Sequence, residues 1–224
     1  MTQPTPVRIG TSDLAVAPLA LGGNVFGWTA DRGTSFEVLD AFVAGGGNFI
    51  DTADGYSAWE PGNTGGESET IIGEWLGARG GRDRVTIATK VSSHPEFSGL
   101  AATNVLAAAD ASLGRLGTDH IDLYYAHFDD ADTPLAETVA AFSSLVDAGK
   151  VRAIGVSNYT ADRVAEWFRI ARDGGYHLPV ALQPHYNLVE RGFETNGLRE
   201  VAEAEGLSVI PYFSLAEGFL AGKY

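Results

Sequence analysis

The chain has 224 residues, of which 45% are hydrophobic, enough to bury a sizeable core, and this length favours a single domain over residues 1–224. Its 29 acidic and 15 basic residues give a net charge of −14, which would repel nucleic-acid phosphates and anionic lipid head groups. Cysteine is absent, which excludes disulfides, thiolate nucleophiles and cysteine metal sites, and we expect no metal centre.

The N-terminus, residues 1–6, has no basic segment followed by an apolar run. No later stretch reaches the roughly 18 apolar residues that a spanning helix needs. These features predict a cytoplasmic protein with neither a nucleic-acid nor a membrane partner, and they leave the oligomeric state open.

The first predicted element is a short antiparallel hairpin over residues 7–21, where apolar residues alternate around the turn-forming Gly10-Thr-Ser-Asp13. Short strand-like runs then alternate with longer segments of helical period, as in parallel sheets with crossover helices. The predicted strands are Leu19–Gly22, Asn48–Thr52, Val85–Lys90, Ile121–His127, Ala153–Val156, Val180–Pro184 and Ser208–Tyr212. The predicted helices are Ser35–Ala44, Glu67–Ala78, Leu100–Leu116, Leu135–Ala148, Ala161–Ala171 and Phe193–Glu205.

This alternation fits both an open doubly wound sheet and a closed (β/α)₈ barrel. The turn after the first strand, Gly22-Gly23-Asn24, lacks the G-x-G-x-x-G fingerprint of the open fold. Polar side chains end or follow several different strands, as they do where a barrel builds its active site. These residues are Asp51, Lys90, His127, Asn158 and Gln183. The sequence therefore favours the barrel.

Taken singly, the chemical groups on this rim have ordinary explanations. An aspartate such as Asp51 after a strand often forms a turn, a strand-ending Lys90 often reaches solvent, and a lone His127 is often structural. Together with Tyr56, however, they bring a carboxylate, an ammonium group, an imidazole and a phenol to one edge.

Asp51, Tyr56, Lys90 and His127 resemble the catalytic tetrad of the aldo-keto reductase family. The matching segments are Gly47–Tyr56, Gly66–Leu76, Arg115–Leu123, Lys150–Tyr159 and Gly218–Lys223, so the resemblance extends from Val7 to Tyr224. It implies a (β/α)₈ barrel with an N-terminal hairpin. Seven of the eight barrel strands lie in this chain. It also implies NADPH-dependent reduction of an aldehyde or ketone, a small-molecule carbonyl substrate.

Elementary chemistry gives each member of the tetrad a task. Tyr56 is protonated at neutral pH and can act as the acid, while a cation such as Lys90 favours its phenolate form. Asp51 would keep Lys90 charged and in place. A neutral His127 can donate a hydrogen bond to the carbonyl oxygen.

The resemblance also implies how a nicotinamide cofactor is held. Ser157, Asn158 and Gln183 would bind the carboxamide, and Tyr212 would stack on the ring, although Ser157-Asn158 alone would suit a helix N-cap. Further cofactor contacts are expected at Gly22, Gly23, Asn24, Asp51, Ser214 and Leu215. The preference for NADP over NAD is a family expectation.

Some positions depart from the commonest family pattern. Tyr212-Phe213-Ser214-Leu215 lacks a frequent serine that contacts the pyrophosphate, for which Ser214 could substitute, and His185 stands where glutamate is frequent. The loop 57–66 is longer than the minimal connection. Aromatic residues in loops of the predicted rim would favour apolar or aromatic carbonyl compounds. They are Trp28, Trp59 and Phe128, while Trp75 and Trp167 are expected in the outer core.

Two alternatives remain at this stage. One is a nucleotide-binding regulatory subunit of the potassium-channel β-subunit type with little turnover, which an intact tetrad disfavours. The other is an isomerase or aldolase barrel in which Lys90 forms a Schiff base.

The seventh strand signal is followed closely by Gly222-Lys223-Tyr224. A closed barrel needs eight strands, and an open sheet would leave unpaired edges. We therefore expect the natural polypeptide to be longer by about one or two βα units, with the residues that grip the adenosine phosphate in the missing part.

Overall fold

A computed structural model describes residues 5–223. Residues 1–4 and Tyr224 lie outside the described residues, so the lack of a leader pattern in residues 1–6 and the end of the family resemblance at Tyr224 have no structural counterpart there.

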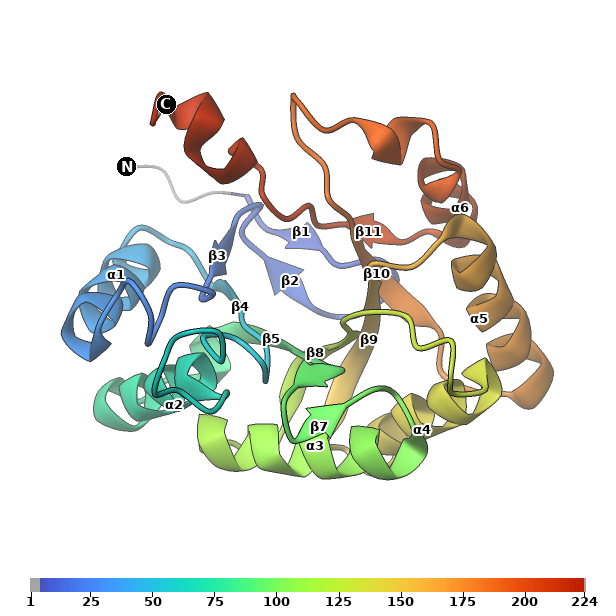
Figure 1. The fold of residues 1–224 in the computed structure, drawn as a ribbon, viewed down its shortest axis with the longest axis horizontal. Helices are drawn as coiled ribbons and strands as arrows, with labels where there is room; N and C mark the ends of the chain where they lie inside the picture. The colour runs from blue at the N-terminus through green and yellow to red at the C-terminus, as the bar shows by residue number, and fades with distance from the viewer. Residues whose placement is uncertain (1–4, 224) are drawn as a thin grey trace.

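The centre of the molecule is a curled sheet of seven parallel strands in the order β11-β10-β9-β8-β5-β4-β3 (Figure 1). The strands are β3 (Ala20–Gly22), β4 (Phe49–Asp51), β5 (Thr86–Val91), β8 (Ile121–Ala126), β9 (Val151–Ser157), β10 (Pro179–Gln183) and β11 (Ser208–Val209). All seven predicted strands are confirmed, with ends shifted by a few residues. Within residues 5–223, β3 and β11 are the two edges of the sheet.

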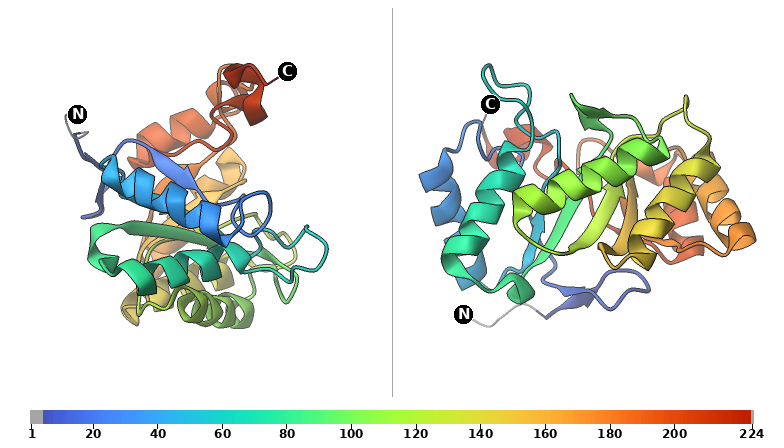
Figure 2. Two further views of the ribbon diagram at one scale, coloured as in Figure 1. Left: turned by 90° about the vertical axis from the view of Figure 1, so that its left-hand side faces the viewer. Right: turned by 90° about the horizontal axis from the view of Figure 1, so that it is seen from below.

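Helices cover the outside of the sheet, as the alternating pattern predicts (Figures 1 and 2). They are α1 (Arg32–Ala44), α2 (Glu67–Arg79), α3 (Ala102–Leu116), α4 (Leu135–Asp147), α5 (Ala161–Gly174) and α6 (Leu198–Glu205), with short 3₁₀ turns η1 (Arg82–Arg84), η2 (Gly192–Glu194) and η3 (Ala216–Ala221). In α3, the buried Val105, Ala108, Ala109, Ser112 and Leu116 recur at helical spacing and face the core.

Helix ends follow local chemistry. Asp31 caps α1 by accepting a hydrogen bond from the backbone N–H of Thr34. The last helix starts later than predicted: Phe193 lies in η2, and α6 begins only after Gly197, whose φ of 86° is not helical. Trp75 and Trp167 are buried between helices and sheet, as expected.

The N-terminal hairpin, β1 (Val7–Arg8) and β2 (Ala15–Val16), closes one end of the barrel (Figure 2). Its buried side chains Ile9, Leu14 and Val16 pack against the barrel interior. A Cβ at Gly10 would lie 2.3 Å from the carbonyl oxygen of Val180, so only glycine allows the hairpin to approach so closely. The expected N-terminal hairpin is therefore confirmed, and it forms the floor of the barrel.

At the opposite end lies a second small hairpin, β6 (Ser93–His94) and β7 (Phe97–Ser98), which the sequence pattern does not predict. The loop of residues 57–66 projects at this same end (Figure 2). Across residues 5–223, no helix combines the length and the apolar character that crossing a membrane requires.

Candidate active site

The expected tetrad gathers at the carboxyl edge of the sheet. Asp51 is the last residue of β4, Lys90 lies near the end of β5, and His127 directly follows β8. Tyr56 lies in the turns after β4. Parallel strands end at one edge, so residues far apart in the chain meet there.

The ammonium group of Lys90 is fully buried and makes three hydrogen bonds. Lys90 Nζ donates to Asp51 Oδ2 at 2.6 Å, to the carbonyl oxygen of Thr52 at 2.7 Å and to the hydroxyl of Tyr56 at 2.9 Å. An ammonium group has three N–H donors, so all of them are used. The cation is therefore fixed in place against the phenol.

The charges around Lys90 decide its protonation. Burial alone would lower the pKa of Lys90, but the nearby Asp51 carboxylate and Tyr56 outweigh this and raise it. Burial raises the pKa of Tyr56, and the positive charge of Lys90 offsets only part of that rise. The site thus holds a protonated phenol beside a permanent cation.

His127 lies across from the phenol, with its ring centroid 6.0 Å from that of Tyr56 and the rings inclined at 72°. Burial, and then the charge of Lys90, lower the pKa of His127 to about 2. The imidazole is therefore neutral at physiological pH, as the expected hydrogen-bonding role requires.

The expected cofactor residues form one hydrogen-bonded group beside the tetrad. Ser157 Oγ donates to the carbonyl oxygen of Gln183 at 2.9 Å, and Asn158 Nδ2 donates to Ser157 Oγ at 3.1 Å and to the carbonyl oxygen of His127 at 2.8 Å. Gln183 Nε2 donates to Asp51 Oδ1 at 3.0 Å, which joins this group to the tetrad. The N-cap of α5 is Thr160, so Ser157 and Asn158 are not the cap.

Tyr212 completes this group from the segment after β11. Its hydroxyl donates to Asn158 Oδ1 at 2.9 Å, and its ring stacks on His185 at 5.1 Å between centroids, with 16° between the planes. His185 thus covers one face of the Tyr212 ring, and stacking with a cofactor would use the other face.

The available atoms fit a nicotinamide carboxamide. The amide oxygen of Gln183 has no hydrogen-bond partner among the described residues, and Asn158 Oδ1 retains a second lone pair beside its bond from Tyr212. Both can accept from a carboxamide NH₂. Ser157 is fully buried and its hydroxyl proton is already given to Gln183, so a direct contact from Ser157 stays a prediction.

The remaining expected cofactor positions lie at the same edge. Gly22 ends β3, and the N–H of Gly23 donates to the carbonyl oxygen of Asp51 at 2.8 Å, with Asn24 next in the chain. Ser214 and Leu215 are exposed just before η3. The segment before them is anchored because Asn187 Nδ2 donates to the carbonyl oxygen of Phe213 at 3.0 Å.

The aromatic residues of the expected substrate pocket are half exposed around the tetrad. Trp28 meets Trp59 edge-on at 5.5 Å, Trp59 lies 6.2 Å from Tyr56, and Phe128 lies 4.6 Å from His127, all between ring centroids. These contacts form a continuous aromatic series from Trp28 to Phe128.

A buried cluster of charged residues lies behind the tetrad, and the sequence pattern does not predict it. Glu69 Oε2 accepts from Arg115 Nε at 2.6 Å, and Glu69 Oε1 accepts from the hydroxyl of Thr89 at 2.5 Å. Asp54 is also fully buried, but neither of its carboxyl oxygens has a hydrogen-bond partner within the described part of the chain. Glu69 lies on the apolar stripe of a predicted helix, and this position of an acidic residue could have indicated a buried charge.

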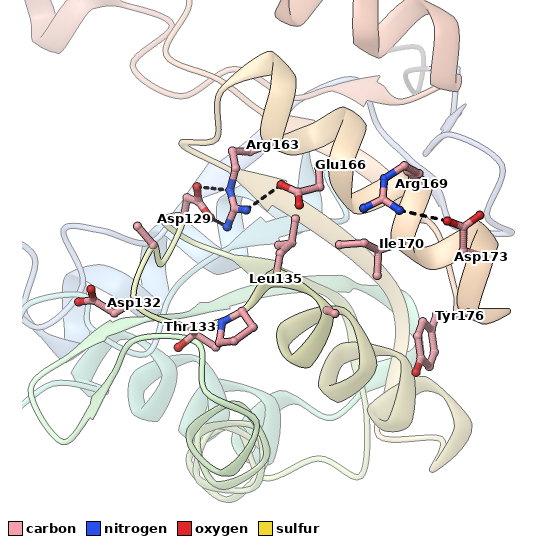
Figure 3. A pocket seen from close by; sticks show the side chains of 14 residues that line it. Asp129, Asp132, Thr133, Leu135, Arg163, Glu166, Arg169, Ile170, Asp173 and Tyr176 are labelled. Carbon is pink, nitrogen blue, oxygen red and sulfur yellow. Dashed lines mark hydrogen bonds and ion pairs between the residues drawn. The ribbon is translucent and has the colours of Figure 1, made fainter.

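A large open groove of about 1000 Å³ lies elsewhere, between α4 and α5 (Figure 3). Its arginines are already paired: Arg163 with Asp129 and Glu166, and Arg169 with Asp173. No tetrad residue lines this groove. Size alone therefore does not mark the site, and the chemistry points to the carboxyl edge of the sheet.

Comparison with known proteins identifies the family of the chain. The model of the Aldo/keto reductase family matches residues 18–224. The chain is 34% identical over 225 residues to norsolorinic acid reductase B of Dothistroma septosporum, covering 93% of this chain and 55% of that protein. It is 35% identical over 243 residues to protein tas of Escherichia coli, covering 97% and 70%, and 35% identical over 220 residues to aldo-keto reductase YhdN of Bacillus subtilis, covering 96% and 62%. The chain thus spans little more than half the length of the first of these relatives.

Proposed function

The chain belongs to the aldo/keto reductase family, a family of (β/α)₈ barrels, and on that premise we propose that it reduces an aldehyde or ketone to an alcohol, with NADPH as the reductant. The observation that carries the proposal is the buried Lys90 ammonium bonded to both Asp51 and Tyr56. The relatives named as reductases support the direction of reaction.

When bound, the reduced nicotinamide supplies a hydride to the carbonyl carbon. Tyr56 gives its proton to the carbonyl oxygen as negative charge develops there, and the Lys90 charge stabilises the phenolate that remains. Asp51 keeps Lys90 charged and fixed, and neutral His127 donates a hydrogen bond that orients the carbonyl oxygen. Asn158, Gln183 and the ring of Tyr212 would hold the nicotinamide.

The half-exposed Trp28, Trp59 and Phe128 support an apolar or aromatic carbonyl compound as substrate, because their rings offer apolar walls beside the proton donor. The Schiff-base alternative is disfavoured by Lys90 itself. Its ammonium group is fully buried and all three N–H donors are used, so it is not available as a nucleophile.

A panel of aliphatic and aromatic carbonyl compounds, followed at the nicotinamide absorbance with NADPH and with NADH, tests the proposal. Turnover that is faster with aromatic compounds and with NADPH is expected. Tight NADPH binding without turnover on any compound would instead favour the regulatory-subunit alternative. Borohydride trapping of a substrate on Lys90 would favour the Schiff-base alternative.

A further inference from the structure

The backbone turns sharply after β5, at Ser92 and Ser93. Ser92 has a φ of 131°, a conformation that L-residues rarely adopt and that persists only where neighbours hold it. Two neighbours do so: the N–H of Phe128 donates to Ser92 Oγ at 3.2 Å, and the N–H of Gly99 donates to the carbonyl oxygen of Ser92 at 3.0 Å. The strained corner is thus tied to the residue that follows His127.

This corner also lies against the turn that carries Tyr56. A Cβ at Gly55 would fall 2.8 Å from Ser93 Oγ and 3.0 Å from the Ser93 carbonyl oxygen, distances too short for any side chain. Glycine at position 55 therefore lets Ser93 come close to the proposed proton donor.

From this position Ser93 reaches His127, with 3.2 Å between Ser93 Oγ and His127 Nδ1. The backbone of His127 is already fixed, because its N–H donates to the Val91 carbonyl oxygen at 3.0 Å and its own carbonyl oxygen accepts from Asn158. What the serine can still control is the imidazole ring: its rotation and the nitrogen that carries the proton.

A neutral imidazole has one N–H donor and one lone-pair acceptor. If the Ser93 hydroxyl donates to Nδ1, the proton must reside on Nε2. Nε2 has no hydrogen-bond partner among the described residues, so this N–H is available to a substrate. If Ser93 accepted instead, Nε2 could only accept and could not bind a carbonyl oxygen.

We propose that Ser93 is a positioning residue that donates to His127 Nδ1, fixes the Nε2–H tautomer and aims that N–H at the substrate carbonyl beside Tyr56. The aim at a carbonyl rests on the proposed function, whereas the hydrogen bond and the tautomer do not. Ser93 is exposed, so water competes for its hydrogen bond to His127. This bond therefore orients the imidazole ring and adds little to the stability of the fold.

Side-chain ¹⁵N NMR of the histidines tests the tautomer without any substrate. The chain has five histidines, and a His127→Gln variant assigns the signal of His127. We expect the Nε2–H pattern in the wild type, its loss to a mixture of tautomers in Ser93→Ala, and its retention in Ser93→Thr. Ser98, which pairs with Ser93 in the small hairpin, provides the control, and Ser98→Ala should leave the signal unchanged. Unchanged signals from the other histidines show that each variant is folded.

Kinetics supply the second measurement. Ser93→Ala should lower kcat/KM for the carbonyl compound by about tenfold, the worth of one oriented hydrogen bond, without changing the Kd for NADPH. Ser93→Thr should restore most of the loss.

A wild-type His127 in the Nδ1–H form, or a His127 signal indifferent to Ser93→Ala, would overturn the proposal. A tautomer that responds to Ser93 in a protein that reduces no carbonyl compound would support the positioning and refute the proposed function.

Discussion

Asp51 and Asp54 follow the same strand and are both buried, at 8% and 0% exposure, but their surroundings differ completely. Asp51 accepts hydrogen bonds from the Lys90 ammonium and from the Gln183 amide. Asp54 has only a backbone bond, from its own N–H to the carbonyl oxygen of Lys90, and its carboxyl oxygens have no partner in the part of the chain described.

Burial without a partner changes the chemistry of an acid. Burial, and then the negative charge of Glu69, raise the pKa of Asp54 from 3.8 to about 8, while Arg115, the nearby backbone N–H of Gly55 and Lys90 act in the opposite direction. Asp54 is therefore largely protonated at physiological pH, close behind the Lys90 ammonium group. For Asp54, whose carboxyl oxygens lack hydrogen-bond partners among the described residues, burial is thus the main reason that the acid holds its proton.

The largest expected effect is on stability and comes from Asp54→Asn. The folded state holds the Asp54 proton more tightly than the unfolded chain, so the contribution of Asp54 to stability is fully present below about pH 4 and is lost as the pH rises through the raised pKa of about 8. The full shift corresponds to a loss on the order of 5 kcal/mol. Asparagine cannot ionise and should remove most of this dependence.

Denaturant unfolding of both proteins between pH 4 and pH 9 measures the effect. The exposed Asp83→Asn serves as the control and should keep the wild-type profile. Parallel pH profiles for wild type and Asp54→Asn would mean that Asp54 is ionised in the folded protein after all.

Tyr56→Phe addresses the partnered side of the comparison. Removing the phenol that Lys90 contacts should lower turnover by about a hundredfold or more, the ordinary worth of general acid catalysis. Tyr124, whose hydroxyl is buried with no hydrogen-bond partner among the described residues and whose pKa is raised by burial, is the matched control.

Single-turnover kinetics with NADPH and an aromatic aldehyde provide the measurement. The single-turnover rate of Tyr124→Phe should stay within about twofold of wild type, and neither substitution should change the Kd for NADPH. Near-native turnover in Tyr56→Phe would exclude it as the proton donor.

A smaller effect is expected on NADPH affinity, and it distinguishes a residue that binds the cofactor from one that supports Lys90. Asn158→Ala removes an amide oxygen that fits the carboxamide and should weaken NADPH binding by about tenfold. Asp51→Asn mainly weakens the hold on Lys90 and should change the affinity much less. Fluorescence titration gives both dissociation constants, and equal values would contradict this division of roles.

The smallest effect concerns the cause of the raised pKa of Asp54. In Glu69→Gln a neutral amide replaces the carboxylate that accepts from Thr89 and Arg115. The pKa of Asp54 should fall but stay above its ordinary value, because burial is the larger cause. Carboxyl ¹³C NMR titration follows this directly, and a return to the ordinary value would make charge the main cause.

The sequence predicts the architecture well because each element has a local signal. Alternating apolar runs mark the seven strands, and polar residues at their ends, such as Lys90 and Gln183, mark the edge where the site lies. The pattern fails where an element is too short to show periodicity or where a single residue sets its boundary. The β6–β7 hairpin is too short for periodicity, and the start of α6 depends on one glycine, Gly197, with a positive φ.

The sequence predicts which residues form the site better than it predicts the contacts between them. The sequence does not reveal that the carboxyl oxygens of Asp54 lack hydrogen-bond partners among the described residues. Arg115 pairs with Glu69 instead, and that pairing depends on the folded structure. Likewise, nothing around Ser93 in the sequence indicates its bond to His127, which joins two loops that meet only in the folded barrel.

The floor hairpin also bears on the order in which the chain folds. The N–H of Gly10 donates to Ser208 Oγ at 2.8 Å, across a separation of 198 residues. The cost of closing so long a loop must be met before this contact can stabilise anything, and topologies rich in such contacts fold slowly. During synthesis the hairpin emerges well before β10 and β11 and cannot dock until they have followed. Its docking should therefore be among the last events of folding, and its amides should gain protection from hydrogen exchange late.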